Sequence, residues 1–246
     1  MSKDLEIHSL SAVEHLLVHC PDRVRYVWIQ SENSRAKHLE KLARAAGIPI
    51  EFPRGKKEGE DSVRAKILPF QYQELKPFLE TLRPTNRSLV LALDHLQDPQ
   101  NFGALCRSAE GLGLHGVLLP RDRSVVVTPG VYHASVGAVA TLPIVSVANL
   151  GEALRKLKED GFWIVGTTLG EGATELSAMP DFEKIVLVLG AEWEGLSASV
   201  EKLCDWRLHI PLQGKVQSLN VSAAGAILMY ALQQRANSLA TKAPSQ

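Results

Sequence analysis

The chain has 246 residues, and 45% of them are hydrophobic, which is enough to bury the core of one large domain or of two smaller ones. Its 27 basic and 27 acidic residues give no net charge and argue against a protein that holds nucleic acid by bulk charge alone. No apolar stretch reaches the roughly 18 residues of a membrane span, and the first residues lack the apolar run of a signal peptide. We therefore expect a cytoplasmic protein with no membrane partner.

Residues 1–68 predict a small mixed α/β domain. Apolar spacing indicates helices at residues 11–19 and 36–46 and strands at residues 25–29, 48–52 and 63–68. Gly47 is placed to end the second helix, and the order strand, helix, strand is that of a βαβ-like unit. Prolines then interrupt a polar stretch with one weak helical pattern, so we predict a linker at residues 69–86.

Residues 87–246 predict a second, larger domain. Six apolar strand candidates alternate with helical stretches, at residues 89–93, 116–119, 143–147, 163–167, 185–189 and 207–210. This alternation is typical of a mostly parallel sheet covered on both faces, in which ligands lie beyond the carboxyl ends of the strands. The loops that follow strands are therefore the candidates for a functional site.

The first such loop is L-D-H-L-Q-D-P-Q-N-F-G-A-L-C-R-S-A-E, residues 93–110. Asn101 is placed to cap the next helix, and Arg107 lies off its apolar stripe. The stripe is formed by Phe102, Leu105, Cys106, Ala109 and Leu112. Taken alone, a capping asparagine and a solvated arginine explain these two residues well. Taken together, they place two polar side chains where the chain passes from a strand into a helix, which is a position suited to a functional site.

Two further loops carry unusual polar residues after strands. In L-V-L-G-A-E-W-E-G-L-S, residues 187–197, Gly190 allows a tight turn and Glu192 lies at its exposed end, although two solvated carboxylates would be an ordinary alternative. In I-P-L-Q-G-K-V-Q-S-L-N-V-S, residues 210–222, Asn220 can cap the apolar helix that follows, but this role leaves Ser218 unexplained. We expect the segment to face a ligand.

The sequence lacks the motifs of several common cofactor, catalytic and metal sites. There is no G-x-G-x-x-G after the first strand, no phosphate loop and no G-x-S-x-G elbow. Three cysteines without C-x-x-C spacing support neither a disulfide framework nor a zinc ribbon. The eight histidines lack metal-ligand spacing, so we expect no metal.

Together and in this order, the three loops resemble the motifs of the SpoU (TrmH-like) family of RNA ribose 2'-O-methyltransferases. The matching strings are D-P-Q-N-F-G-A-L-C-R-S-A, L-G-A-E-W-E-G-L and I-P-L-x-G-x-V-x-S-L-N-V-S-A-A. The likeness covers residues 88–236. It implies a parallel sheet with a C-terminal trefoil knot, S-adenosylmethionine as cofactor, and a homodimer. It also implies that the N-terminal domain is a ribosomal-protein-like RNA-binding module.

The resemblance also assigns residues. It implies cofactor contacts, largely through the backbone, at Thr167, Gly190, Ile210 and Leu219. It implies catalytic positions at Asn101, Arg107, Glu192, Ser218 and Asn220. A guanidinium is always protonated and makes a poor base, so we expect Arg107 to orient the ribose and stabilise the developing alkoxide, with Glu192 orienting Arg107.

The expected substrate is a guanosine of 23S ribosomal RNA, and DNA is not expected to bind. Transfer RNA is the alternative substrate, and an assembly factor that binds RNA without catalysis is the alternative class. In the N-terminal domain, the basic residues fit either a phosphate-contacting cluster or a solvated loop. They are Arg54, Lys56, Lys57 and Arg64.

Overall fold

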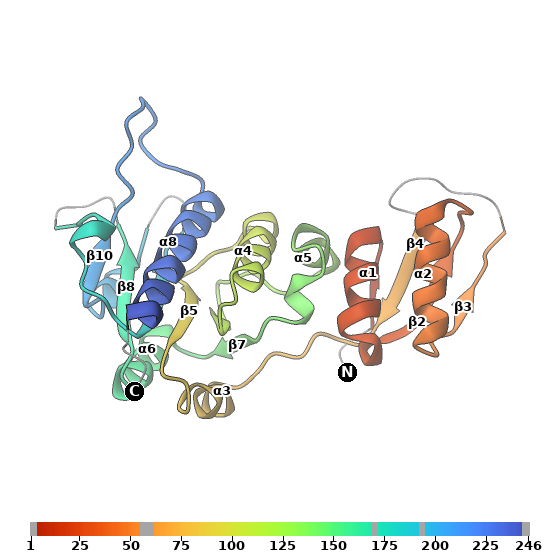
Figure 1. Cartoon of the computed structure of the whole chain (residues 1–246), viewed down its shortest axis with the longest axis horizontal. Coiled ribbons are helices and arrows are strands. Elements are labelled where there is room, and N and C mark those ends of the chain that lie inside the picture. The colour runs from red at the N-terminus through yellow and green to blue at the C-terminus, as the bar shows by residue number, and fades with distance from the viewer. Residues whose placement is uncertain (1–3, 55–61, 169–171, 192–194, 243–246) are drawn as a thin grey trace. The chain divides into compact units, whose positions relative to one another are not determined.

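Figure 1 shows the protein as a computed structural model that describes residues 4–54, 62–168, 172–191 and 195–242. The chain forms two compact units, and each is built from separate stretches of sequence. Unit 1 contains Met1–Gln71, Pro99–Arg107 and Val126–Leu142. Unit 2 contains Tyr72–Asp98, Ser108–Val125 and Pro143–Gln246. Helix α4 (Pro99–Gly111) belongs partly to each.

Unit 1 contains a four-stranded mixed sheet. Its strands are β1 (Leu5–Ile7), β2 (Val24–Ile29), β3 (Ile50–Glu51) and β4 (Val63–Ile67), in the order β1-β4-β2-β3. Strands β2 and β3 run parallel, and β4 is antiparallel to β1 and β2. Helices α1 (Leu10–His19) and α2 (Ser34–Ala45) contact each other and the sheet. The predicted helices and strands are confirmed, and β1 is an additional strand.

Local sequence signals explain where the helices of unit 1 begin and end. The Ser9 hydroxyl accepts a hydrogen bond from the Ala12 amide at 3.4 Å, and Asn33 Oδ1 accepts one from the Ala36 amide at 2.8 Å. Gly47 follows α2 with a φ of 68°, which favours glycine. The predicted end of the second helix is therefore confirmed to within two residues.

The later stretches of unit 1 pack against α1. Helix α5 (Pro129–Ala134) and the short 3₁₀ turn η3 (Ala138–Ala140) both contact it. The Cys20 thiol lies 3.7 Å from the Ala140 carbonyl, and Thr141 Oγ1 lies 3.2 Å from His15 Nε2. A side chain at Gly137 would place its Cβ 2.7 Å from that of His15. Close packing thus joins parts of the chain more than 100 residues apart.

Unit 2 is built on a six-stranded sheet whose paired strands all run parallel. The strand order is β10-β8-β9-β5-β6-β7. The strands are β5 (Ser88–Leu93), β6 (Gly116–Pro120), β7 (Ile144–Val147), β8 (Trp163–Thr167), β9 (Lys184–Leu189) and β10 (Trp206–Leu208). All six predicted strands and the α/β class are confirmed. The carboxyl ends of the strands lie along one edge, as in other parallel sheets.

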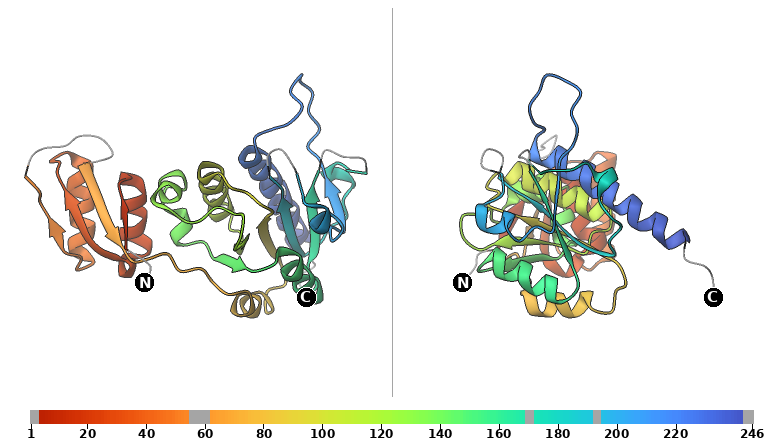
Figure 2. Two further views of the ribbon diagram at one scale, coloured as in Figure 1. Left: turned by 180° about the vertical axis from the view of Figure 1, so that it is seen from behind. Right: turned by 90° about the vertical axis from the view of Figure 1, so that its left-hand side faces the viewer.

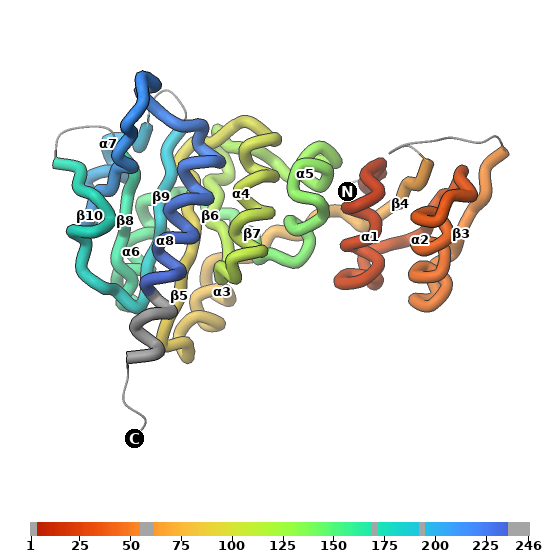
Figure 3. Tube along the Cα trace, turned by 45° about the horizontal axis from the view of Figure 1, so that its top comes forward, coloured from red at the N-terminus to blue at the C-terminus, as the bar shows by residue number. Residues whose placement is uncertain are grey.

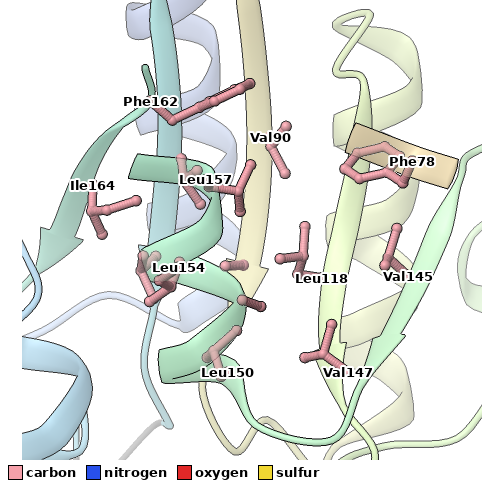
Figure 4. Close-up of a cluster of buried hydrophobic side chains, with 14 of the residues drawn as sticks. Phe78, Val90, Leu118, Val145, Val147, Leu150, Leu154, Leu157, Phe162 and Ile164 are labelled. Carbon is pink, nitrogen blue, oxygen red and sulfur yellow. The ribbon is translucent and has the colours of Figure 1, made fainter. Parts of the chain in front are cut away.

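One hydrophobic core of unit 2 lies between the sheet and helices α3 (Leu75–Leu82) and α6 (Leu150–Glu159). Figure 4 shows Leu150, Leu154 and Leu157 of α6 facing the strands that carry Val90 and Leu118. Helix α3 lies inside the segment predicted as a linker, residues 69–86, and buries Phe78, Leu79 and Leu82. The spacing of these three residues gives α3 an apolar face, so this part of the segment is packed structure.

Helix α8 (Val221–Lys242) packs against β9 on the opposite face from α6 (Figures 3 and 4). It buries Leu228, Met229 and Leu232. The short helix α7 (Ala198–Glu201) precedes β10. The segment between β10 and α8 projects from unit 2 in the views of Figure 2. Within the described residues, no helix combines the length and the apolar character needed to span a membrane.

Candidate active site

Three predicted cofactor residues follow neighbouring strands at the same edge of the sheet. Thr167 ends β8 and pairs with Leu208 of β10, and Ile210 follows two residues later. On the other side, β8 pairs with β9, after which comes Gly190. The Thr167 hydroxyl donates a hydrogen bond to the Val188 carbonyl at 3.3 Å, which ties the two strand ends together. The structure therefore places Thr167, Gly190 and Ile210 at one edge.

The turn after β9 requires glycine at position 190. The amides and carbonyls of Ala191 and Gly195 exchange two hydrogen bonds of 3.0 Å, which hold these two residues opposite each other. A Cβ on Gly190 would lie 2.1 Å from the carbonyl carbon of Gly195 and 2.5 Å from the Leu196 nitrogen. Gly195 itself has a φ of 66°. The pattern of two glycines thus defines the path of the backbone at the predicted cofactor loop.

A buried carboxylate joins this turn to the loop after β5. Asp94 is 1% exposed, and its Oδ2 accepts a hydrogen bond from the Ser197 amide at 2.7 Å. Its Oδ1 lies 2.7 Å from His95 Nδ1, and its own amide donates to the Leu189 carbonyl. Sequence reasoning missed this role. The available signal was a single acidic residue directly after the apolar run L-V-L-A-L.

Helix α4 carries Asn101 and Arg107. The expected cap at Asn101 is wrong, because the helix already begins at Pro99 and Asn101 lies in its first turn. Proline suits a first turn since its missing amide would have no partner there. Asn101 is 9% exposed and Arg107 is exposed. Six residues turn a helix by about 240°, so these two side chains leave α4 in different directions.

The predicted stripe of α4 is largely confirmed. Four of its residues are fully buried, namely Phe102, Leu105, Cys106 and Ala109. Leu112 lies just beyond the helix and is half-buried. Arg107 lies off the stripe as predicted, and it forms no ion pair with any residue in the described part of the chain. Its guanidinium is available to an anionic or polar ligand.

The third loop, residues 209–220, has no regular secondary structure. Ser218 is exposed and Leu219 is half-buried. The predicted cap at Asn220 is confirmed: its Oδ1 accepts hydrogen bonds from the Ser222 amide at 2.9 Å and the Ser222 hydroxyl at 2.6 Å. The Ala223 amide lies 3.4 Å from the same oxygen. Asn220 therefore fixes the start of α8 and the exit of the loop.

Glu192 lies outside the described residues, as do Lys56 and Lys57 of the basic cluster. The predicted site residues that the structure describes fall into three groups. Thr167, Gly190 and Ile210 lie at or just after the ends of adjacent strands, and Ser218, Leu219 and Asn220 follow in the segment after Ile210. The third group, Asn101 and Arg107, lies on α4.

The cysteines are poor candidates for chemistry. Burial raises the pKa of the Cys106 thiol, and burial together with the nearby carboxylates of Glu201 and Asp205 raises the pKa of Cys204 to about 11. Both therefore stay protonated and weakly nucleophilic near neutral pH. Within the described part of the chain, no group of three or more His, Cys, Asp or Glu side chains is arranged to hold a metal ion.

Known proteins share both the sequence and the fold. Residues 88–230 match the model of the SpoU rRNA Methylase family. A 23S rRNA (guanosine-2'-O-)-methyltransferase from Pseudomonas putida is 35% identical over 247 residues, covering 96% of this chain and 98% of that protein. A protein from Staphylococcus saprophyticus, named as a candidate TrmH family tRNA/rRNA methyltransferase, is 36% identical and covers 86% of this chain and 88% of its own length.

A solved structure extends the comparison to the fold. The SpoU methyltransferase AviRb from Streptomyces viridochromogenes, in complex with its cofactor AdoMet, superposes with a TM-score of 0.76 at 23% sequence identity. The match covers 96% of this chain and 91% of that one. The matched region of the family model contains the six parallel strands and the three loops described above. The chain belongs to the SpoU rRNA methylase family.

Proposed function

We propose that this protein transfers a methyl group from S-adenosylmethionine to the ribose 2'-hydroxyl of a guanosine in 23S ribosomal RNA. The observation that carries the proposal is the family match over residues 88–230, joined to near-complete coverage of a 23S rRNA guanosine methyltransferase. The second candidate substrate is transfer RNA, which the name of the Staphylococcus relative includes. Both substrates require the same chemistry at the ribose.

The residues at the strand edge suit the proposed cofactor. The ends of β8, β9 and β10 lie side by side, and a glycine at position 190 keeps the second of them free of a side chain. Backbone groups near Thr167, Gly190, Ile210 and Leu219 would hold S-adenosylmethionine. When bound, this group supplies a methyl carried on a positively charged sulfur. AviRb, which has the same fold, was solved with this cofactor.

The chain itself must position and activate the sugar. A ribose hydroxyl is a weak nucleophile at neutral pH, so the reaction needs close alignment and stabilisation of developing negative charge on the oxygen. Arg107 is exposed and forms no ion pair among the described residues, and its permanent charge fits this second role. Ser218 and Asn220 would hold the ribose through neutral hydrogen bonds.

Two further residues would act through their neighbours. Asn101 is buried in the first turn of α4 and would position the preceding loop. Glu192 would orient Arg107. The expected homodimer is supported by an apolar stripe on α8. Ala223, Ile227 and Tyr230 follow one another at helical spacing and are exposed on the single chain. Burying this stripe against a second copy would remove it from water.

The finer architecture is part of the same proposal. We infer a trefoil knot in the C-terminal segment, from family membership, and an RNA-binding role for the N-terminal domain at residues 1–68. The cytoplasmic location predicted from the sequence also belongs here, as does the division into a linker at residues 69–86, which includes the packed helix α3, and a methyltransferase domain at residues 87–246.

The test is direct transfer of labelled methyl groups. Purified protein, S-adenosylmethionine and transcripts of 23S ribosomal RNA or transfer RNA are incubated, and the modified ribose is located by reverse-transcription stops at low nucleotide concentration. We expect one guanosine of 23S RNA to be labelled, and Arg107→Ala to reduce the rate by about 100-fold or more. Label in transfer RNA alone would select the second substrate, and absence of label from every RNA would refute a methyltransferase.

A further inference from the structure

Helix α2 of unit 1 carries a concentration of positive charge that the chain as a whole does not have. Its sequence S-R-A-K-H-L-E-K-L-A-R-A contains four arginine or lysine residues and one glutamate, whereas the whole chain is neutral. The buried positions are Ala36, Leu39 and Ala43, which hold the helix to its unit. All four cationic side chains are exposed. The charge is therefore presented to solvent by a helix whose apolar side is packed against its unit.

Three of these cations form a single row. Lys37, Lys41 and Arg44 are spaced by four and then three residues, so they lie above one another on the helix surface. At a rise of 1.5 Å per residue, the row spans about 10 Å along the helix axis. We call these three residues the α2 basic stripe.

The nearby acidic groups leave the stripe positive. Glu14 of α1 pairs with Arg35 and His38, which lie on another side of α2. Glu40 binds Arg44 through Nε at 3.0 Å and Nη2 at 2.8 Å, and so holds this guanidinium in place.

Within the described residues, Lys37 and Lys41 have no ion-pair partner. Among the residues that the structure describes, the three positive charges of the stripe thus form one ion pair, that of Arg44 with Glu40.

We propose that the α2 basic stripe binds the phosphate backbone of the RNA substrate. The inference rests on the proposed function for the identity of the RNA and adds the surface that holds it. A row of three exposed cations, of which Arg44 pairs with Glu40, is complementary to the regular negative charge of a nucleic-acid strand. Lysine binds phosphate as a point charge, and the stripe has no aromatic side chain on which a base could stack. It therefore supplies affinity and register but no base specificity.

The size of the effect follows from counterion release. Each phosphate contact contributes about 0.7 to 0.9 to the slope of log affinity against log salt concentration. At about 0.15 M salt this corresponds to roughly four- to fivefold in affinity for each contact, and to roughly 50- to 150-fold for three. Removing the stripe should therefore lower the salt slope by about 2 to 3 and weaken binding by up to this factor.

The experiment measures binding of the full-length protein to 23S ribosomal RNA transcripts by filter retention at several salt concentrations. The stripe variant is Lys37→Gln, Lys41→Gln and Arg44→Gln, which keeps good helix formers. A charge-preserving variant, Lys37→Arg, Lys41→Arg and Arg44→Lys, should bind like the wild type. The matched control removes three cations of unit 2 that are also exposed: Arg155→Gln, Lys156→Gln and Lys202→Gln. Circular dichroism verifies that each variant is folded.

We expect the stripe variant to lose affinity for every RNA tested by a similar factor, with a smaller salt slope, while the control loses much less. If the folded stripe variant keeps the salt slope and the RNA affinity of the wild type, the proposal is wrong, and the stripe contacts a protein partner or only solvent. Binding needs no methyl transfer, so the two proposals fail separately. Wild-type protein that binds RNA through the stripe but transfers no methyl group would refute the proposed function alone.

Discussion

Replacing Gly190 by alanine tests whether the turn after β9 shapes the cofactor site. The new Cβ would lie 2.1 Å from the Gly195 carbonyl carbon, and ordinary contact needs about 3.5 Å, so the turn must open by about 1.4 Å. Such a shift breaks the two hydrogen bonds between Ala191 and Gly195, each of which contributes about 0.5–1.5 kcal/mol. We expect the free energy of unfolding to fall by about 1–3 kcal/mol.

We also expect the rate of methyl transfer to fall by about 100-fold, because misplacement of a binding group by about 1 Å can cost about this factor. Urea unfolding followed by circular dichroism gives the stability, and calorimetric titration gives the affinity for S-adenosylmethionine. The matched control is Gly111→Ala, where no atom lies within 4 Å of the new methyl group. Gly190→Ala protein that binds S-adenosylmethionine as tightly as the wild type would refute the role of this turn.

Two other changes test the buried groups around the site. In Asp94→Ala the Ser197 amide loses its hydrogen-bond acceptor, so we expect the free energy of unfolding to fall by about 1–3 kcal/mol and cofactor binding to weaken. Asp94→Asn should be less affected. Equal stability of Asp94→Ala and wild type in urea unfolding would contradict this role. For Cys204, burial raises the pKa to about 11, so the protonated thiol favours the folded state. This contribution is complete below the unfolded pKa of 9.0 and is lost as pH rises through about 11. Thermal melting between pH 8 and 11 should therefore show a steeper decline in wild type than in Cys204→Ala, and parallel curves would exclude the effect.

The sheet of unit 2 was predictable because each strand is a short apolar run with its own boundaries. Residues 163–167 form β8 as predicted, four other strands differ by one residue at one end, and β10 differs by one residue at its start and two at its end. Buried parallel strands are apolar on both faces, so their signal is local and does not depend on distant partners. The positions of Thr167, Gly190 and Ile210 at one edge follow from the same pattern.

The features that sequence reasoning missed depend on distant contacts or on details of the backbone. Strand β1 has three residues and exists through its antiparallel pairing with β4, about 60 residues away. Asn101 resembles a capping residue, but Pro99 starts the helix two positions earlier. The role of Asp94 is visible only once Ser197, 103 residues later, is folded beside it. The acidic residue directly after β5 is visible in the sequence, but its hydrogen-bond partner is not.

The interleaving of the two units has a consequence for synthesis of the protein. Unit 1 takes its last stretch from Val126–Leu142, which includes Gly137 packed against His15. The N-terminal strands and helices emerge first from the ribosome, yet their unit stays incomplete until more than half of the polypeptide has been translated. Nascent chains halted before residue 126 should thus resist protease less well than chains that extend past residue 142.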